Sequence, residues 1–246
     1  MTGAEWIVLT LAAAFVGLSK GGFAAVGSIA VPVAALVMSP VQAAGLLLPV
    51  YVVSDAFGVW AWRRSFDRRV LAILIPGSIV GIALGWAMAS RISDTAVGAM
   101  IGVIGAVFAI RQLWPRKGAE AAPRPARVGP GLFWGALAGF TSFVSHSGAP
   151  PYQVYVQPLR LSAQSFAGTT TLFFAATNAV KLIPYAALGQ LAPANFGIMA
   201  VLAVPAVICV FVGRWAVRVI PQRTFFLFIN WALLLVSIEL IWRALR

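Results

Sequence analysis

The stretch Thr141-Ser-Phe-Val-Ser-His-Ser-Gly-Ala-Pro-Pro-Tyr152 is the most polar run inside any apolar part of the sequence. It interrupts a region without formal charge that extends from Arg127 to Arg160. Hydroxyl groups, an imidazole ring and backbone donors are costly against lipid, so they should line a cavity or pair with other helices. Pro150 and Pro151 can begin the next helix, because residues in a first turn do not need their N–H groups. The run therefore predicts a broken helix inside a membrane.

The composition around this stretch is that of a membrane protein. Of the 246 residues, 61% are hydrophobic and 10% are charged, whereas about 25% are charged in a typical soluble domain. A helix needs about 20 apolar residues to cross a bilayer, so the chain has room for roughly eight to ten crossings and no large soluble domain. A net charge of +12 would indicate nucleic acid in a soluble protein. Here the basic residues lie between apolar runs, which indicates a lipid bilayer as the partner and no nucleic acid.

The small number of reactive side chains excludes several classes of protein. Cys209 is the one cysteine and His146 the one histidine, so neither an intramolecular disulfide nor a histidine-rich metal site can form. The sequence has no glycine-rich phosphate-binding loop and no pair of carboxylates in one polar loop. We therefore expect no metal, no cofactor and no enzymatic activity.

Charge-free gaps divide the sequence into ten apolar segments. They lie near residues 5–18, 23–38, 41–62, 70–89, 95–114, 130–144, 149–159, 163–186, 194–213 and 223–243. The segments at 5–18 and 149–159 are too short to cross a bilayer as straight helices, and each adjoins a cluster of Gly, Ser or Pro residues. Broken or re-entrant helices are expected there.

Lys and Arg residues in short loops predict the orientation. If the arginines of Arg63-Arg64-Ser65-Phe66-Asp67-Arg68-Arg69 face the cytoplasm, alternation places Arg160 and the stretch 115–129 on the same side. That stretch is polar, basic and Pro-rich, which is typical of a flexible connector. The sequence thus predicts a first repeat at 1–114, a cytoplasmic linker at 115–129 and a second repeat at 130–246, with both termini facing outward.

The two halves on either side of the linker share a pattern. An offset of 123 residues aligns Gly17-Leu-Ser19 with Phe140-Thr-Ser142, Gly45 with Gly168, and Ser54-Asp55 with Thr177-Asn178. Each half crosses the bilayer an odd number of times, either in five full crossings or in three crossings and a re-entrant hairpin, so the repeats are inverted. The predicted fold is an all-α polytopic membrane protein with two inverted repeats of about five apolar segments each, and broken or re-entrant helices at the centre. Many secondary transporters have this architecture and bind their substrate near the breaks.

The first candidate binding site is the break at Gly17-Leu-Ser-Lys-Gly-Gly-Phe23. Gly21 and Gly22 let the backbone leave helical geometry, and freed N–H groups beside a helix N-terminus bind anions. Lys20 adds a full positive charge, with Ser19 beside it. The alternative is structural, with glycines that permit close helix packing and a Lys20 side chain that extends to the cytoplasmic interface.

The second candidate site is the polar run that follows residue 140. We expect Ser142, Ser145, His146, Ser147 and Gly148 to bind the substrate, because the positive end of the next helix points back at the break. A kink stabilised by serine hydroxyls is the structural alternative. His146 titrates near neutral pH and either gates or relays protons, or serves as a neutral hydrogen-bonding partner.

Asp55 is the one carboxylate in the middle of the first-half apolar run, and a carboxylate inside a membrane is functional by default. It either couples or gates transport, or pairs with a basic residue such as Lys20 or Arg63. Its counterpart in the repeat, Asn178, is not titratable and is a candidate substrate contact.

Three further side chains complete the candidate set. Thr169 and Thr170, in the run Gly168-Thr-Thr-Thr171, either contact the substrate or bond to carbonyl groups of their own helix. Lys181 either extends outward to the interface or guards an anion pathway as a gating residue. Trp62 is one of eight tryptophans near predicted segment ends, where interfacial anchors lie.

Six motifs carry a family resemblance: Gly17-Leu-Ser-Lys-Gly-Gly-Phe23, Val31-Pro32, Ser39-Pro-Val-Gln-Ala-Ala-Gly45, Leu48-Pro49, Phe140-Thr-Ser-Phe-Val-Ser-His-Ser-Gly-Ala-Pro-Pro-Tyr-Gln-Val-Tyr155 and Gly168-Thr-Thr170. With them the chain resembles the sulfite exporter TauE/SafE family over nearly its whole length. Ala24, Ala25 and Ser28 stand where glycines are common in that family. The resemblance implies a multi-pass carrier in the bacterial inner membrane for small sulfur-containing anions: sulfite, sulfoacetate or other organosulfonates, or thiosulfate.

The favoured function is export of such an anion by a secondary carrier that works by alternating access. A membrane potential that is negative inside drives a monovalent anion outward with about 2.3 kcal/mol per 100 mV, so export needs no coupling ion. The alternative is a proton-coupled importer of a small organic or inorganic anion, in which Asp55 or His146 sets a pH-dependent rate. A membrane protein without transport activity is a third reading, and a homo-oligomer is compatible with each.

Overall fold

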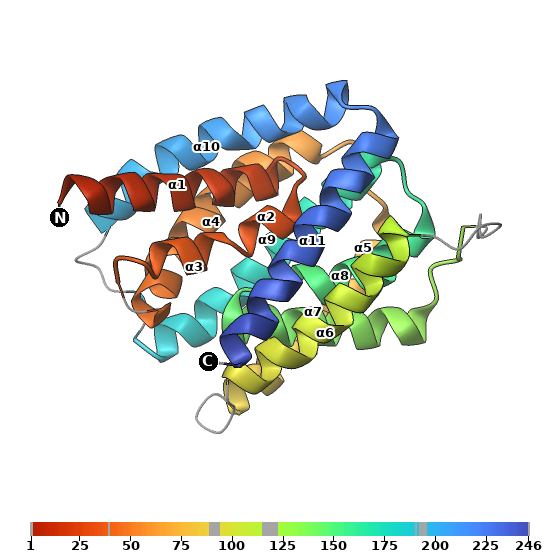
Figure 1. Cartoon of the computed structure of the whole chain (residues 1–246), viewed down its shortest axis with the longest axis horizontal. Coiled ribbons are helices and arrows are strands. Elements are labelled where there is room, and N and C mark those ends of the chain that lie inside the picture. The colour runs from red at the N-terminus through yellow and green to blue at the C-terminus, as the bar shows by residue number, and fades with distance from the viewer. Residues whose placement is uncertain are drawn as a thin grey trace. The chain divides into compact units, whose positions relative to one another are not determined.

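The computed structural model describes residues 2–38, 40–88, 94–114, 123–189, 191 and 196–245 (Figure 1). Every regular element in these ranges is a helix, so the predicted all-α class is confirmed. In chain order the elements are α1 (Gly3–Lys20), α2 (Ala24–Gly27), α3 (Ala30–Ala34), α4 (Pro40–Trp62), α5 (Arg68–Ala87), α6 (Asp94–Leu113), α7 (Val128–Ser145), α8 (Ala149–Val156), the 3-10 turn η1 (Gln157–Leu159), α9 (Ala163–Ala187), α10 (Phe196–Val219) and α11 (Gln222–Ala244). Residues 115–122 of the predicted linker lie outside the described residues, as does the side chain of Ser145.

Five helices in the described ranges are long and apolar enough to cross a membrane. They cover Gly3–Lys20, Gln42–Trp62, Arg68–Ala87, Gly197–Val219 and Gln222–Ala244, and shorter apolar helices cover Ala24–Ala34, Gly102–Leu113 and Val128–Val144. On α10 the exposed side chains include Val201, Val204, Ile208 and Trp215, which recur every three to seven residues along one side. Such an exposed apolar stripe is unfavourable in water and suits contact with lipid.

The helices next to the two predicted breaks differ from the expectation in one respect. The segment 5–18 is not short: α1 has 18 residues and begins early, because Thr2 and Glu5 form a reciprocal capping box at its N-terminus. The first interruption instead follows α1, where the next apolar segment splits into the short helices α2 and α3. The segment 149–159 is short as predicted, with eight residues in α8 and a single turn in η1.

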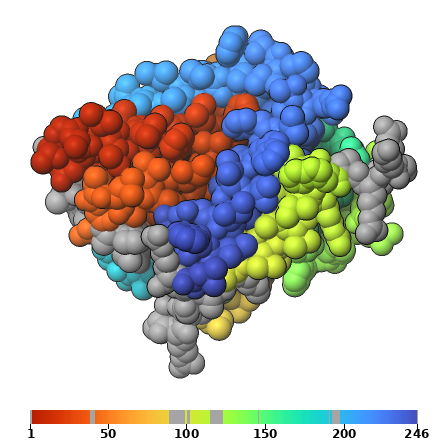
Figure 2. Space-filling view, viewed as in Figure 1, coloured from red at the N-terminus to blue at the C-terminus, as the bar shows by residue number. Residues whose placement is uncertain are grey.

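By internal contacts the chain forms two compact units. Unit 1 comprises Met1–Phe66 and Ala167–Val219, and therefore holds α1 to α4, α10 and nearly all of α9. Within it α1 lies along α10 (Figures 1 and 2). A Cβ added at Gly17 would come 1.9 Å from the carbonyl oxygen of Ala206, and one at Gly21 would come 2.6 Å from Cα of Gly213. The two backbones thus touch at positions where only glycine fits.

Unit 2 comprises Asp67–Phe166 and Ile220–Arg246, and holds α5 to α8, η1 and α11. Within it α5 packs on α7 through glycines on both helices: a Cβ added at Gly81 would lie 1.9 Å from the Ala136 carbonyl oxygen, and one at Gly139 would lie 2.2 Å from that of Ser78. Helix α6 lies against α11 (Figure 2). Close contact through small residues therefore organises each unit.

Candidate functional site

Lys20, Asp55 and Asn178 meet in unit 1, each from a different helix. The ammonium Nζ of Lys20 lies 2.8 Å from Oδ1 of Asp55. The Asn178 amide Nδ2 donates to Oδ2 of the same carboxylate at 2.8 Å. The three residues are 3%, 4% and 4% exposed. One carboxylate oxygen thus faces an ammonium in an ion pair and the other accepts a hydrogen bond from an amide. We call this group the Lys20–Asp55–Asn178 cluster.

The end of α1 positions Lys20 for this contact. Lys20 is in the last turn, and the chain reverses at Gly22, whose φ of 126° is in the region that favours glycine. The N–H groups of Gly21, Gly22 and Phe23 donate to the carbonyls of Gly17, Ser19 and Leu18. The predicted anion cradle of free N–H groups therefore does not form at these three residues, because closing the helix end uses the donors. Substrate binding by Gly21 and Gly22 stays a prediction.

The Lys20 carbonyl, which would lack a partner at a helix end, accepts two side-chain hydrogen bonds. Trp62 Nε1 donates to it at 3.2 Å and Thr171 Oγ1 at 2.9 Å. Trp62 is 1% exposed, so its interpretation as an interfacial anchor is wrong. Gly58 makes room for this contact, since a Cβ there would come 2.7 Å from Cγ2 of Thr171.

Aromatic rings cover the Lys20 ammonium. Nζ is 5.0 Å from the ring centroid of Tyr51 and 5.8 Å from that of Phe174, distances at which a cation is attracted to a ring face. The Tyr51 hydroxyl donates to the Gly27 carbonyl at 2.7 Å, which joins α4 to α2. The alternative in which Lys20 extends to the interface is therefore wrong. Tyr51 was not predicted, although it stands one helical turn before Asp55 on α4.

Lys181 is also buried in unit 1, on α9 one turn after Asn178. Its exposure is 0%, so the alternative in which it extends outward is wrong. Its Nζ lies 5.6 Å from the ring centroid of Tyr185, and its charge interacts with those of Asp55 and Lys20. A second lysine is thus buried within electrostatic reach of the Lys20–Asp55 ion pair.

The ion pair with Lys20 decides between the two partners considered for Asp55. Arg63 instead donates to the Trp60 carbonyl at 2.5 Å and lies over the Trp60 ring. Pairing with Lys20 does not exclude a role in coupling or gating, because a buried pair can open and close. That role stays a prediction for Asp55, as it does for Lys181.

The hydroxyl residues near the cluster already have contacts with the protein. Ser19 Oγ donates to the Val16 carbonyl at 2.6 Å, one turn back in α1. Thr169 and Thr170 are fully buried on α9 and each makes further interactions. Substrate contact by these three residues stays a prediction.

The second interruption lies in unit 2 between α7 and α8. His146 ends α7 with a left-handed φ of 54°, its N–H donates to the Ser142 carbonyl at 3.2 Å, and that of Ser147 donates to the Thr141 carbonyl at 3.2 Å. Thr141 Oγ1 donates to the Ser147 carbonyl at 3.2 Å and so fixes the turn. These contacts are those of a closed helix end, in which the N–H groups of His146 and Ser147 are not free for an anion.

Helix α8 begins with Pro150 and Pro151 in its first turn, as predicted. Ser142, Ser147 and Gly148 are buried, and His146 is half-buried. Because Lys20 belongs to unit 1 and this interruption to unit 2, the meeting of the two breaks in one pocket stays a prediction. Substrate binding by Ser142, Ser145, His146, Ser147 and Gly148 stays one as well.

A family model described as sulfite exporter TauE/SafE matches residues 9–240 of the chain. The chain belongs to this family. The matched range includes the whole Lys20–Asp55–Asn178 cluster and both interruptions. Searches of the curated proteins and of the solved structures found no match. Membership in the TauE/SafE family, together with the five apolar helices, makes the protein a multi-pass membrane protein of a transporter family for sulfur-containing anions.

Proposed function

We propose that the protein is a secondary carrier that exports a small sulfur-containing anion across the bacterial inner membrane by alternating access. The substrate class is sulfite, sulfoacetate or another organosulfonate, or thiosulfate. Family membership supports the class of anion. The observation that carries the mechanism is the buried Lys20–Asp55–Asn178 cluster, in which an ammonium and an amide converge on one carboxylate.

The contacts of the Asp55 carboxylate support an oxyanion site at the cluster. Its two oxygens are bound by two donors on different helices, and this arrangement suits any oxyanion with two accessible oxygens. A substrate anion binds here when Asp55 moves with α4 away from Lys20. Lys181 is a second basic side chain within electrostatic reach of Asp55, and it becomes a further partner for an anion that replaces this carboxylate.

A buried ion pair contributes little to folding stability on balance. The cost of removing two charges from water is often larger than their mutual attraction, and apolar replacements of a similar size are frequently as stable. Charged residues inside a membrane are therefore expected to serve ion or substrate movement. This supports a transport role for Lys20 and Asp55 rather than a structural one.

We further infer that α4 and α9 are equivalent helices of two inverted repeats. They begin at Pro40 and Ala163, which are separated by the predicted offset of 123. At the same offset, Ser54 Oγ donates to the carbonyl of Val50 and Thr177 Oγ donates to that of Phe173. Equal side-chain bonds at equivalent positions support a common origin of the two helices.

The hydrogen bond between Asp55 and Asn178 supports a role for this symmetry in the cluster. The two residues are 123 positions apart and therefore equivalent to one another. Residues related by a two-fold axis can touch each other only beside that axis. This supports a substrate site on the pseudo-two-fold axis, which in inverted-repeat carriers lies near the bilayer midplane.

Tracer flux in proteoliposomes tests the function. We expect wild-type protein to move at least one of sulfite, thiosulfate and short alkyl sulfonates, and to move it faster when a potential drives the anion outward. Lys20→Ala should abolish the flux, whereas Arg63→Gln, which removes a basic side chain outside the cluster, should leave it within about twofold of wild type. No flux of any sulfur anion through wild-type protein would reject the function. Wild-type flux through Lys20→Ala would reject only the site.

A further inference from the structure

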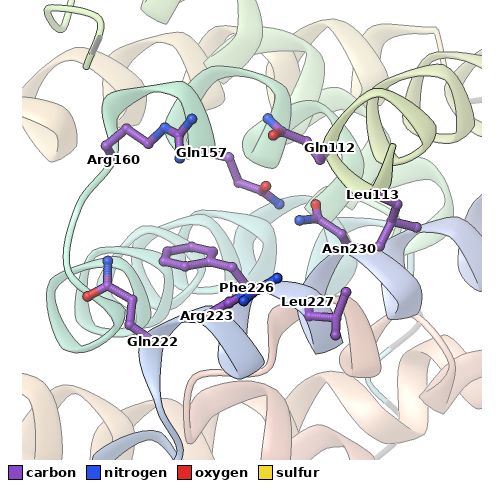
Figure 3. A pocket seen from close by; sticks show the side chains of 9 residues that line it. All are labelled: Gln112, Leu113, Gln157, Arg160, Gln222, Arg223, Phe226, Leu227 and Asn230. Atoms are coloured by element: carbon purple, nitrogen blue, oxygen red, sulfur yellow. The ribbon is translucent and has the colours of Figure 1, made fainter. Parts of the chain in front are cut away.

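Unit 2 contains a pocket that plays no part in the proposed transport cluster. Its volume is about 530 Å³, and it lies where the end of α6, the turn after α8 and the start of α11 come together (Figure 3). The residues that matter here are Gln112, Gln157, Arg160, Arg223, Phe226 and Asn230. Of these, only Arg160 bears on the predicted orientation in the membrane.

The polar lining of the pocket is suited to an anion. Two guanidinium groups, from Arg160 and Arg223, come from different segments, and the other polar lining groups are the amides of Gln112, Gln157, Gln222 and Asn230. No carboxylate is among the lining residues that the structure describes. Guanidinium groups bind sulfonate, sulfate and phosphate oxygens with paired hydrogen bonds. The ring of Phe226 and the side chain of Leu227 add an apolar wall for an organic part.

One amide of the pocket lining, and one behind it, lack part of their hydrogen bonding. Asn230 is 6% exposed, and its Oδ1 finds no hydrogen-bond partner among the described residues. Figure 3 shows the amides of Gln157 and Asn230 turned toward each other within the pocket. Behind them Gln157 Nε2 donates to Gln153 Oε1 at 2.8 Å, and Nε2 of the fully buried Gln153 is likewise unpartnered in the described part of the chain. Oδ1 of Asn230 is an acceptor and does not bind an anion in this rotamer. A 180° rotation of the amide exchanges its oxygen and nitrogen and turns the Nδ2 donor toward the pocket, where a bound oxyanion supplies its partner.

The backbone conformation of Arg160 also supports an anion site. Its φ is 55°, a left-handed conformation that favours glycine or asparagine, and its N–H donates to the Gln157 carbonyl at 3.1 Å. A residue with a Cβ is strained in this conformation. Glycine would form the same turn without that strain, so the turn itself does not require arginine. Strain of this kind is retained where the side chain has a function. The charge of Arg160 beside the pocket is the candidate reason.

We propose that this pocket is a second oxyanion site, which binds the sulfonate, sulfate or phosphate head group of an organic anion between Arg160 and Arg223 with Gln157 and Asn230 at its floor. Either a soluble anion or the phosphate of an anionic phospholipid supplies this head group. The site depends on residues of unit 2 alone. It stands whether or not the Lys20–Asp55–Asn178 cluster transports an anion.

Binding to the full-length protein in nanodiscs tests the proposal in two arms. In phosphatidylcholine nanodiscs, calorimetric titration with ethanesulfonate measures binding of a soluble anion. In nanodiscs that also contain phosphatidylglycerol, native mass spectrometry measures the anionic lipid retained by the protein. Arg223→Gln should weaken one of these interactions about tenfold or more, since each charge-assisted hydrogen bond contributes at least that factor. Arg160→Asn should do the same, and asparagine tolerates the left-handed backbone.

Matched variants separate this site from other effects. Arg243→Gln removes an exposed arginine from the same helix, where it pairs with Glu239, and should change binding less than about twofold. Lys20→Met should leave binding at the pocket intact even where it abolishes flux, so the two proposals fail independently. Asn230→Leu should weaken binding while thermal stability is unchanged or higher, because the unpartnered amide is removed.

The two arms identify the source of the head group. Arginine-dependent ethanesulfonate binding assigns the pocket to a soluble anion, and arginine-dependent phosphatidylglycerol retention assigns it to a lipid. The proposal is overturned if neither interaction depends on Arg160 and Arg223, or if Arg243→Gln weakens binding as much as they do. It is also overturned if Asn230→Leu lowers stability and leaves binding unchanged, because the amide is then structural.

Discussion

The two interruptions, one in each unit, use a similar backbone turn for different chemistry. In unit 1, α1 ends and the chain turns at Gly22 with φ 126°; in unit 2, α7 ends and the chain turns at His146 with φ 54°. In both, N–H groups beyond the helix return to its last carbonyls. Unit 1 then places the Lys20 ammonium against a carboxylate, whereas unit 2 places the Thr141 hydroxyl against a backbone carbonyl. A helix break alone therefore does not produce a buried ion pair. The pair in unit 1 requires a charged residue in the last helical turn and a counter-ion from another helix.

The proposed repeat sharpens this difference. At the offset of 123, the position of Lys20 corresponds to Phe143, which is buried, and Asp55 corresponds to the uncharged Asn178. Both charges of the ion pair thus belong to the first repeat. A carrier built on this proposed repeat would take both charges of its ion pair from one repeat.

The largest expected effect is on stability when Asp55 is removed from unit 1. Asp55→Ala leaves the Lys20 ammonium buried beside Lys181 without its counter-ion, and the free energy of unfolding should fall by about 3–5 kcal/mol. Denaturant titration in detergent micelles measures it. Glu239→Ala breaks an exposed ion pair and should cost less than about 0.5 kcal/mol. Equal losses of stability in the two variants would show that burial does not make the Asp55 ion pair more important for stability than an exposed one.

The next effect concerns the turn residues themselves. Gly22→Ala forces a Cβ into a left-handed backbone and to within 2.8 Å of Ala167 and Val217, and should cost about 1–3 kcal/mol. His146→Gly relaxes the corresponding turn in unit 2, so its stability should stay within about 1 kcal/mol of wild type. Thermal unfolding of both variants measures the contrast. A larger loss in His146→Gly than in Gly22→Ala would mean that the imidazole, and not the backbone, holds the second turn.

A smaller effect separates structure from transport at two threonines. Thr171→Val and Thr141→Val each remove one hydroxyl donor to a buried carbonyl, and each should cost about 1 kcal/mol of stability. Only Thr171→Val should lower anion flux, because its acceptor is the carbonyl of Lys20. Stability and proteoliposome flux are measured for the same preparations. A loss of flux in Thr141→Val alone would move the transport site to the second interruption.

The smallest expected effect is on the pH dependence of transport. Export driven by voltage alone should show a nearly constant rate from about pH 5 to 8, in wild type and in His146→Gln. Flux at fixed potential across this range tests it. A rate that changes with pH in wild type and becomes constant in Asp55→Asn would replace uncoupled export with proton coupling through that carboxylate.

Sequence patterns predicted the features that depend on local chemistry. Long apolar segments without charge predict the helices, and the cost of charges in lipid singles out Lys20 and Asp55. The pairing of Asp55 with Lys20 was one of two alternatives, since sequence spacing gives no distance between helices. Asn178 is predicted only because the repeat offset aligns it with Asp55.

The features that were missed depend on tertiary contacts. Trp62 and Thr171 bind a backbone carbonyl on another helix, and an apolar or hydroxyl side chain carries no sign of such a partner. The expected cradle of free N–H groups was wrong because a helix end closes on its own carbonyls, which the glycine pattern does not reveal. The pocket of unit 2 draws its residues from three distant segments, so no local motif marks it.

The glycine contacts of α1 and α10 bear on how the cluster can move. The backbones of α1 and α10 touch at Gly17 and Gly21 with no side chain between them. We expect two helices in such close contact to move together as a rigid pair. Lys20 lies at the end of this helix pair, in the last turn of α1. Helix α9 meets Lys20 through the Thr171 hydroxyl and the Phe174 ring, and it meets α4 through the Asn178 amide, contacts that a rocking motion can release and remake. We therefore expect α1 and α10 to move together, and a rearrangement of the cluster to require that α9 breaks these contacts.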